Sequence, residues 1–150
     1  MTLTKIVSGG QTGVDRGALD AALAANFECG GWMPADRVAE DAVVPERYPL
    51  TPLAKGGYRA RTRLTRNLCA LEKNPFVLVD AERLSVAEAV HAVKIFIEDH
   101  RIGVINVAGP RASGWREGQQ FSFDVVGGVI ASGLPQGEPR WSTPGREHGT

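Results

Sequence analysis

The stretch SGGQTGVDRGALDAAL, which runs from Ser8 to Leu23, decides the fold class of this chain. A short apolar run, Leu3 to Val7, leads directly into its glycines and is typical of a buried strand. Apolar residues take up helical spacing from Val14 onward, and Thr12 and Asp15 have the spacing of a capping box at the helix start. The pattern therefore predicts a strand, a glycine loop and a helix, in that order.

The rest of the chain repeats this alternation of strands and helices. Two further apolar runs have the length and composition of buried parallel strands. A full capping box, Ser85 with Glu88, opens the helix between them. The expected elements are a weak strand at Phe27–Met33, a long loop at Pro34–Pro52, a helical tendency at Leu53–Lys73, strands at Pro75–Asp80 and Ile102–Val107, and helices at Val86–Ile97 and Gln119–Ala131.

The order of these elements predicts one α/β domain over residues 1–131, Rossmann-like and three-layered, with a mainly parallel sheet. Eighteen glycines in 150 residues exceed the usual share of about 7%, which points to tight backbone turns. Glycine and proline crowd residues 132–150, so we expect an irregular C-terminal tail there.

Composition and charge exclude several classes of protein. Seventeen basic residues balance seventeen acidic ones, so no overall field draws the chain to nucleic acid or to an anionic membrane. The apolar runs are shorter than the roughly 18 residues that a membrane span requires. Cys29 and Cys69 lack ligand spacing, so neither a disulfide framework nor a zinc site is predicted. The first residues do not resemble a signal peptide, and a cytoplasmic location is the expectation.

The glycine loop is the strongest candidate for a binding site. Ligands of parallel α/β sheets bind beyond the carboxyl ends of the strands, and a helix N-terminus attracts phosphate through its unpaired N–H groups. Glycines at positions 9, 10, 13 and 17 let the backbone approach a ligand closely, although a tight strand-to-helix turn explains them as well. The spacing fits neither a dinucleotide fingerprint nor a Walker A loop, which argues against a dehydrogenase or a P-loop NTPase.

Basic residues supply a second candidate. Arg59, Arg63 and Arg66 fall on one helical face with Arg61 beside them, so they either anchor a phosphate or form a solvated face. Arg111 follows a Gly-Pro turn and lies in the same crevice as the glycine loop if the two preceding strands are neighbours.

The long loop offers Arg37, Glu40 and Asp41, which either contact ligand hydroxyls or are solvated. No Ser-His-Asp pattern, paired glycosidase carboxylates or metal-ligand spacing emerges from the sequence. We therefore predict neither catalytic residues nor a metal site.

The chain resembles the circularly permuted YpsA-type SLOG family, whose members are often described as molybdenum carrier proteins. The resemblance covers about residues 3–131, and two motifs carry it most specifically: SGGQTGVDR at Ser8–Arg16 and NVAGPR at Asn106–Arg111. Softer support comes from GGWMPADRVAEDAVVPERYPL at Gly30–Leu50, and from Tyr58 and Arg61-Thr62. The resemblance implies a Rossmann-like fold, a site for a phosphorylated or nucleotide-like ligand, homo-oligomers, and binding of the molybdenum cofactor.

Carried over residue by residue, the resemblance implies that the glycine loop holds a phosphate, and that Asp15 and Arg16 fix the loop or meet the ligand. Arg61 and Thr62 match the family's Arg-Thr pair, whereas Thr65 stands where an asparagine is expected. The implied cofactor-binding residues are Ser8, Gly9, Gly10, Gln11, Thr12, Gly13, Asp15, Arg16, Arg61, Thr62, Gly109 and Arg111.

The chain departs from the family in its middle. Only Leu68–Pro75 separates Asn67 from Phe76, where relatives have a strand, a Gly-Gly-Thr motif and a helix. A crossover takes at least about 10 to 12 residues, so one βα unit is expected to be missing. The sheet should then be narrower than is usual in the family, half of the ligand crevice should be absent, and the exposed sheet surface favours oligomers.

Three functions follow as alternatives. The first is a carrier or binding protein for the molybdenum cofactor, which holds a phosphorylated, nucleotide-like ligand at the glycine loop and binds no metal directly. The second is a nucleotide N-glycosidase like the phosphoribohydrolases, although their PGGxGTxxE-type motif is not found here. The third is a shortened, non-binding subunit of an assembly.

Overall fold

The computed structural model describes residues 1–55 and 74–133. Predictions for Arg59, Arg61, Thr62, Arg63, Arg66, Cys69 and the C-terminal tail lie outside these ranges. The elements are β1 (Lys5–Val7), α1 (Val14–Ala24), β2 (Cys29–Gly30), β3 (Trp32–Met33), β4 (Thr51–Pro52), α3 (Val86–Asp99), β5 (Val104–Asn106) and α4 (Gly118–Gly133).

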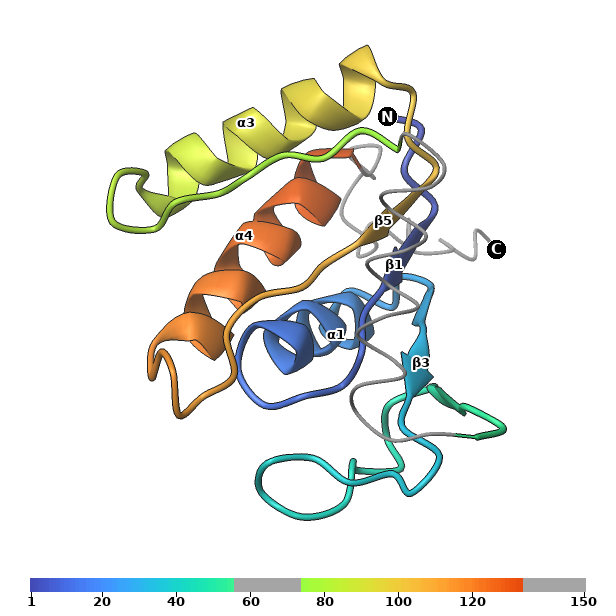
Figure 1. The fold of residues 1–150 in the computed structure, drawn as a ribbon. Coiled ribbons are helices and arrows are strands. Elements are labelled where there is room, and N and C mark those ends of the chain that lie inside the picture. The colour runs from blue at the N-terminus through green and yellow to red at the C-terminus, as the bar shows by residue number, and fades with distance from the viewer. Residues whose placement is uncertain (56–73, 134–150) are drawn as a thin grey trace, which may run out of the picture.

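The main sheet has three strands in the order β2-β1-β5, and both of its pairings are parallel. Strands β3 and β4 form a second parallel pair. Helices α1, α3 and α4 all lie on one side of the main sheet (Figure 1), so the described ranges show two of the three expected layers. The Rossmann-like α/β class and the mainly parallel sheet are thus confirmed.

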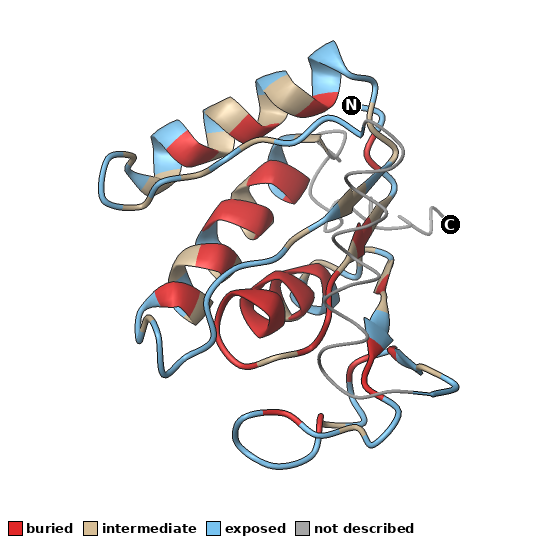
Figure 2. Ribbon diagram, viewed as in Figure 1, coloured by how far each residue is buried: buried red, intermediate tan, exposed pale blue. Residues whose placement is uncertain are grey.

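The core lies between the main sheet and the three helices. Ile6 of β1 is 1% exposed, and the small residues Ala18 and Ala22 of α1 are fully buried against it (Figure 2). Ile97 of α3 and Ile130 of α4 close this core from the helix side. A second apolar cluster packs on the other face of α1, where Leu19, Met33, Ala39, Val44, Tyr48 and Leu50 are buried.

The capping box predicted for α3 is confirmed, and the one predicted for α1 is not. Ser85 caps α3 as predicted: its hydroxyl accepts the Glu88 amide at 3.3 Å, and the Glu88 carboxylate accepts the Ser85 amide at 2.8 Å. The capping box at α1 is wrong, because Gly13 is the N-cap and makes no side-chain cap bond. Thr12 lies outside the helix, and its hydroxyl contacts other loops instead.

The weak strand predicted at Phe27–Met33 is two strands that belong to different sheets. β2 pairs with β1, and β3 pairs with β4. Gly31 separates them with a φ of +134°, and a Cβ there would lie 2.0 Å from the carbonyl oxygen of Ser8. The break therefore requires a glycine, because glycine tolerates both this backbone angle and the close approach of Ser8, the residue after β1.

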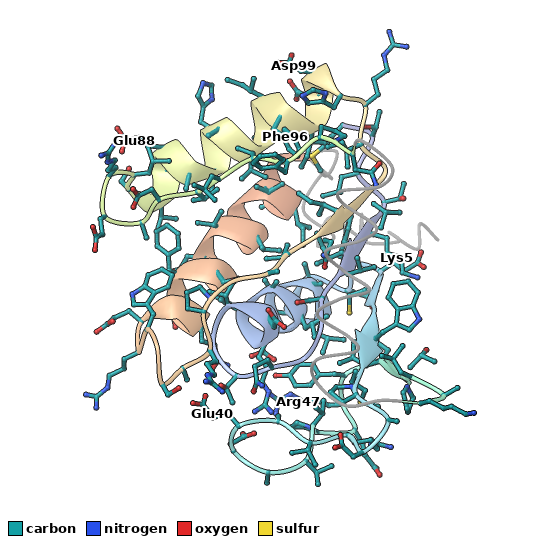
Figure 3. All side chains as sticks on the ribbon, viewed as in Figure 1. Lys5, Glu40, Arg47, Glu88, Phe96 and Asp99 are labelled. Carbon is teal, nitrogen blue, oxygen red and sulfur yellow. The ribbon has the colours of Figure 1, made fainter. Side chains whose placement is uncertain are left out.

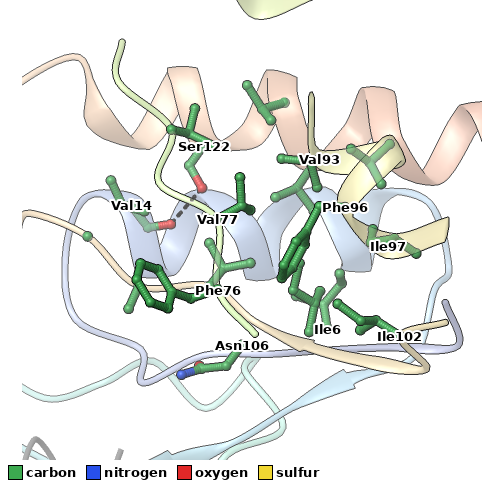
Figure 4. A pocket seen from close by; sticks show the side chains of 18 of the residues that line it. Ile6, Val14, Phe76, Val77, Val93, Phe96, Ile97, Ile102, Asn106 and Ser122 are labelled. Carbon is green, nitrogen blue, oxygen red and sulfur yellow. Dashed lines mark hydrogen bonds between the residues drawn. The ribbon is translucent and has the colours of Figure 1, made fainter. Parts of the chain in front are cut away.

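The buried strand predicted at Pro75–Asp80 is wrong. The segment joins neither sheet, and Phe76 and Leu78 are 83% and 84% exposed, whereas Val77 and Val79 are half-buried. A cavity of about 720 Å³ separates the segment from β5 (Figure 4). A buried parallel strand needs apolar cover on both faces, and the described helices cover one face only.

Candidate functional site

Two loops that are distant in sequence meet beyond the strand ends. We call Ser8–Gly13 the glycine loop and residues 107–113 the Pro110 loop. Because β1 and β5 are paired, the loops lie side by side, as the sequence analysis required for Arg111. The Ser8 hydroxyl donates to the Val107 carbonyl at 2.7 Å, and the Val14 amide donates to the Pro110 carbonyl at 3.3 Å. These bonds join the loops into one surface.

Several amides of the glycine loop are already used inside the protein. The Ser8 amide donates to the Gly30 carbonyl at 3.0 Å, the Gln11 amide to the Asp15 carboxylate at 3.4 Å, and the Thr12 amide to the Gln11 side chain at 3.0 Å. Within residues 1–55 and 74–133, no acceptor meets the amides of Gly9, Gly10 and Gly13, although all three residues are buried. Buried amides are nearly always paired, so these three donors call for an acceptor.

The glycines of this loop also have structural reasons to be glycine. Gly10 and Gly13 have φ angles of +75° and +82°, a backbone region that favours glycine. A Cβ on Gly10 would lie 2.4 Å from Leu50 Cδ1, and one on Gly13 would lie 2.6 Å from the Pro110 carbonyl oxygen. A tight turn therefore explains the glycines at both positions.

The predicted long loop ends one strand earlier than expected, because Thr51–Pro52 is β4. The loop of residues 34–50 folds over the glycine loop and brings Glu40 to the place where the loops meet (Figure 3). The Thr12 hydroxyl donates to the Glu40 carboxylate, which also accepts the Ser113 amide at 3.4 Å. The Gln11 side-chain oxygen accepts the Glu40 amide at 2.8 Å. Bonds from Ser113 and Thr12 hold the pKa of the Glu40 carboxyl below its ordinary value.

Arg16 is buried, and its hydrogen bonds hold the glycine loop in place. Its Nε donates to the Gly10 carbonyl at 3.1 Å, and its Nη1 and Nη2 donate to Asp41 at 2.5 and 2.8 Å. The bidentate guanidinium lowers the pKa of the Asp41 carboxyl. Asp15 and Arg16 therefore both bind backbone of the glycine loop, and Arg16 also binds the Asp41 side chain of the long loop.

The other predicted residues in the described ranges make fewer contacts through their side chains. Arg111 and Gly109 are exposed on the Pro110 loop, and the Arg111 charge also lowers the pKa of Glu40. A Cβ on Gly109 would lie 2.8 Å from Val14, so this glycine lets the loop approach α1. Arg37 has a φ of +58°, and its Nε is buried without a hydrogen-bond partner among the described residues.

One polar network beside the site was missed in the sequence. The buried Tyr48 donates its hydroxyl to Asp20 at 2.8 Å and accepts from Arg47 at 2.5 Å, and Gln119 of α4 donates to Asp20 at 3.0 Å. Burial and the neighbouring Asp20 raise the pKa of Tyr48 to about 12. No spacing rule signals this network, because its members come from α1, the long loop and α4.

The cavity of about 720 Å³ lies between the 74–79 segment, α3, α4 and β5 (Figure 4). Apolar side chains such as Ile6, Val93 and Phe96 line it. It reaches the candidate site at Val14 and at residues 107–110 of the Pro110 loop. No residue of the glycine loop lines it, so the cavity and the amides of Gly9, Gly10 and Gly13 are separate features.

Within the described parts of the chain, no three His, Cys, Asp or Glu side chains are placed to hold a metal ion. Burial raises the pKa of the half-buried Cys29 thiol, which disfavours the thiolate that metals bind.

Over the same residues, no helix is long and apolar enough to cross a membrane.

Comparisons with known proteins point to one family. The sequence profile of the circularly permutated YpsA SLOG family matches residues 6–65 and 61–130. The two matched stretches overlap at residues 61–65. A search of curated proteins found no match.

A solved structure also matches. It is the crystal structure of a "Putative molybdenum carrier protein" from Syntrophus aciditrophicus, 33% identical, with a TM-score of 0.79 over 86% of this chain and 96% of that one. The family profile spans most of the chain. This chain belongs to the circularly permuted YpsA SLOG family.

Proposed function

We propose that this protein binds a phosphorylated, nucleotide-like ligand at the glycine loop. The observation that carries the proposal is the set of buried amides of Gly9, Gly10 and Gly13, which have no acceptor among the described residues. They precede the N-terminus of α1, where the helix dipole favours an anion. A phosphate has the oxygens to accept several such donors at once.

The molybdenum cofactor is the ligand that we favour within this class. Its phosphate suits the free amides, and Arg111 on the adjacent loop supplies a cation. The described residues offer no cluster that would hold molybdenum itself, so the metal would stay with the cofactor as cargo. The solved relative carries the name of a molybdenum carrier, and a cytoplasmic carrier is the role that we propose here.

Calorimetry on the purified protein tests this proposal. We expect heat of binding with pyrophosphate, with nucleoside monophosphates and with the molybdenum cofactor. Arg111→Gln should weaken binding by about tenfold, since a hydrogen bond to a charged group contributes about 1.5–3 kcal/mol. Arg116→Gln is the matched control, because Arg116 is also exposed and lies five residues further along the chain.

Two results would contradict the proposal. A wild-type protein that is silent toward all of these ligands would leave only the assembly role. Release of free base from a nucleoside monophosphate would instead indicate an N-glycosidase. Gly10→Val is a poor test of binding, because the added side chain meets Leu50 and disturbs the fold itself.

The exposed segment of residues 75–80 supports a second proposal, that the protein forms a homo-oligomer. Phe76 and Leu78 are among the most exposed large apolar side chains of the described ranges. Such side chains are usual at interfaces between subunits.

A further inference from the structure

We infer that Glu40 is an internal competitor for the ligand's anionic group: in the free protein its carboxylate occupies the junction of the glycine loop and the Pro110 loop, and an incoming phosphate displaces it. This inference rests on the proposed function and adds how the same site is regulated. The observation behind it is that a carboxylate already takes donors that lie at this junction.

The donors that Glu40 uses are of the kind a phosphate uses. The Thr12 hydroxyl donates to its Oε2, and so does the Ser113 amide at 3.4 Å. The Ala112 amide donates to the Thr12 oxygen at 3.1 Å, so the hydroxyl proton points away from the Pro110 loop and toward Glu40. The Arg111 charge is close enough to stabilise the carboxylate. Hydroxyl, amide and arginine together form an anion-binding set, and Glu40 is the anion in it.

The same carboxylate is free to leave. Glu40 is exposed, so its charge is hydrated again as soon as it swings outward. The neighbouring Asp41 stays bound to the buried Arg16, and the Glu40 amide stays bound to Gln11. Displacement therefore moves one side chain and leaves the long loop in place.

Charge repulsion makes the displacement necessary. A phosphate that takes the Thr12 and Ser113 donors would meet the glutamate carboxylate that now holds them, and like charges at such short distance disfavour each other. The observed affinity for an anion is then reduced by the fraction of molecules in which Glu40 occupies the junction.

Calorimetric titration with pyrophosphate at fixed pH and ionic strength tests the inference. Glu40→Gln keeps the size of the side chain and an acceptor oxygen but removes the charge, and we expect it to bind pyrophosphate about tenfold more tightly than the wild type, as a difference of about 1.4 kcal/mol requires. Glu46→Gln is the control for a general change of charge, because Glu46 is exposed on the same loop. It should change the affinity less than twofold or so, as a distant exposed charge is screened.

Each outcome of the titration supports or overturns the inference. Equal or weaker binding by Glu40→Gln overturns the inference and leaves the proposed function standing, because the wild type still binds. If Glu40→Gln weakens the binding of a nucleoside monophosphate but not that of pyrophosphate, Glu40 instead holds a hydroxyl group of the ligand. Absence of binding in the wild type and in both variants overturns the proposed function and the inference together. Glu40→Ala, which removes the carboxyl group altogether, must shift the affinity in the same direction as Glu40→Gln.

Discussion

At the scale of single residues, Tyr48 shows how a polar side chain is accommodated in an apolar cluster. It is 3% exposed and packs with Leu19, Met33 and Leu50. Its hydroxyl is satisfied by Asp20 and Arg47, and the Arg47 guanidinium lies 4.5 Å from the centre of its ring. The phenol is therefore held in its neutral form, in which it is a donor to Asp20.

The titration of Tyr48 gives a prediction for alkaline pH. The pKa is raised from 10.0 to about 12 in the folded protein, so the stabilisation it provides is complete below the unfolded pKa of about 10 and is lost as the pH rises toward 12. Of the two tyrosines, Tyr48 should ionise at about pH 12 in a tyrosinate absorbance titration. Tyr48→Phe should remove that step and flatten the alkaline loss of thermal stability. Ionisation of both tyrosines together near pH 10 in the folded protein would contradict this.

At the scale of elements, the packing of α1 on α4 depends on one missing side chain. A Cβ on Gly17 would lie 2.2 Å from the Gln119 carbonyl oxygen and 2.9 Å from Ser122 Cβ. The close approach allows the Ser122 hydroxyl to donate to the Val14 carbonyl at 2.8 Å (Figure 4). The bond fixes the start of α1, and hence the glycine loop, relative to α4.

Gly17→Ala should therefore destabilise the protein, by about 1–3 kcal/mol as is usual for overpacking. Gly127→Ala is the matched control within a helix, because its nearest neighbour is Ala21 Cβ at 4.0 Å. Alanine is the better helix former by about 1 kcal/mol, so the control should be neutral or stabilising. Urea unfolding curves measure both free energies. Equal stability of the two variants would show that α1 and α4 are not held at this distance.

The elements also show what the sequence could predict. The helices α1 and α3 could be predicted, because each depends on a local periodic pattern. The pairing of β1 with β5 was only a condition for the position of Arg111, because no local pattern specifies which strands are neighbours. The state of residues 75–80 was not, because an apolar run forms a buried strand only where other elements cover both of its faces. Glu40 was identified as a candidate, but its contact with Thr12 and Ser113 depends on how a long loop folds, for which no spacing rule exists.

At the scale of the whole molecule, large apolar side chains remain exposed along one edge. Phe76 and Leu78 of the detached segment and Val104 of β5 are 83%, 84% and 53% exposed. This segment, residues 75–80, follows the middle region in which the sequence predicts a missing βα unit. A second subunit would remove these side chains from water, which favours association.

We therefore expect the protein to sediment as a homo-oligomer at micromolar concentration. The double variant Phe76→Ser/Leu78→Ser should shift it toward the monomer, because it removes the exposed apolar surface of the segment. Ile95→Ser is the control, since Ile95 is an apolar side chain of α3 that is 44% exposed and lies outside the segment in sequence. A wild type that is monomeric over the whole concentration range, or an equal shift with the control, would refute the prediction.

The central position of β1 has a consequence for how the protein is made. Lys5, Ile6 and Val7 pair with Val104, Ile105 and Asn106, so β1 gains this neighbour only after all the elements between them have been synthesised. Contacts of such long sequence separation slow folding. The glycine loop is joined to the Pro110 loop only after β5 has been made, so a nascent chain that stops before β5 lacks half of the candidate site.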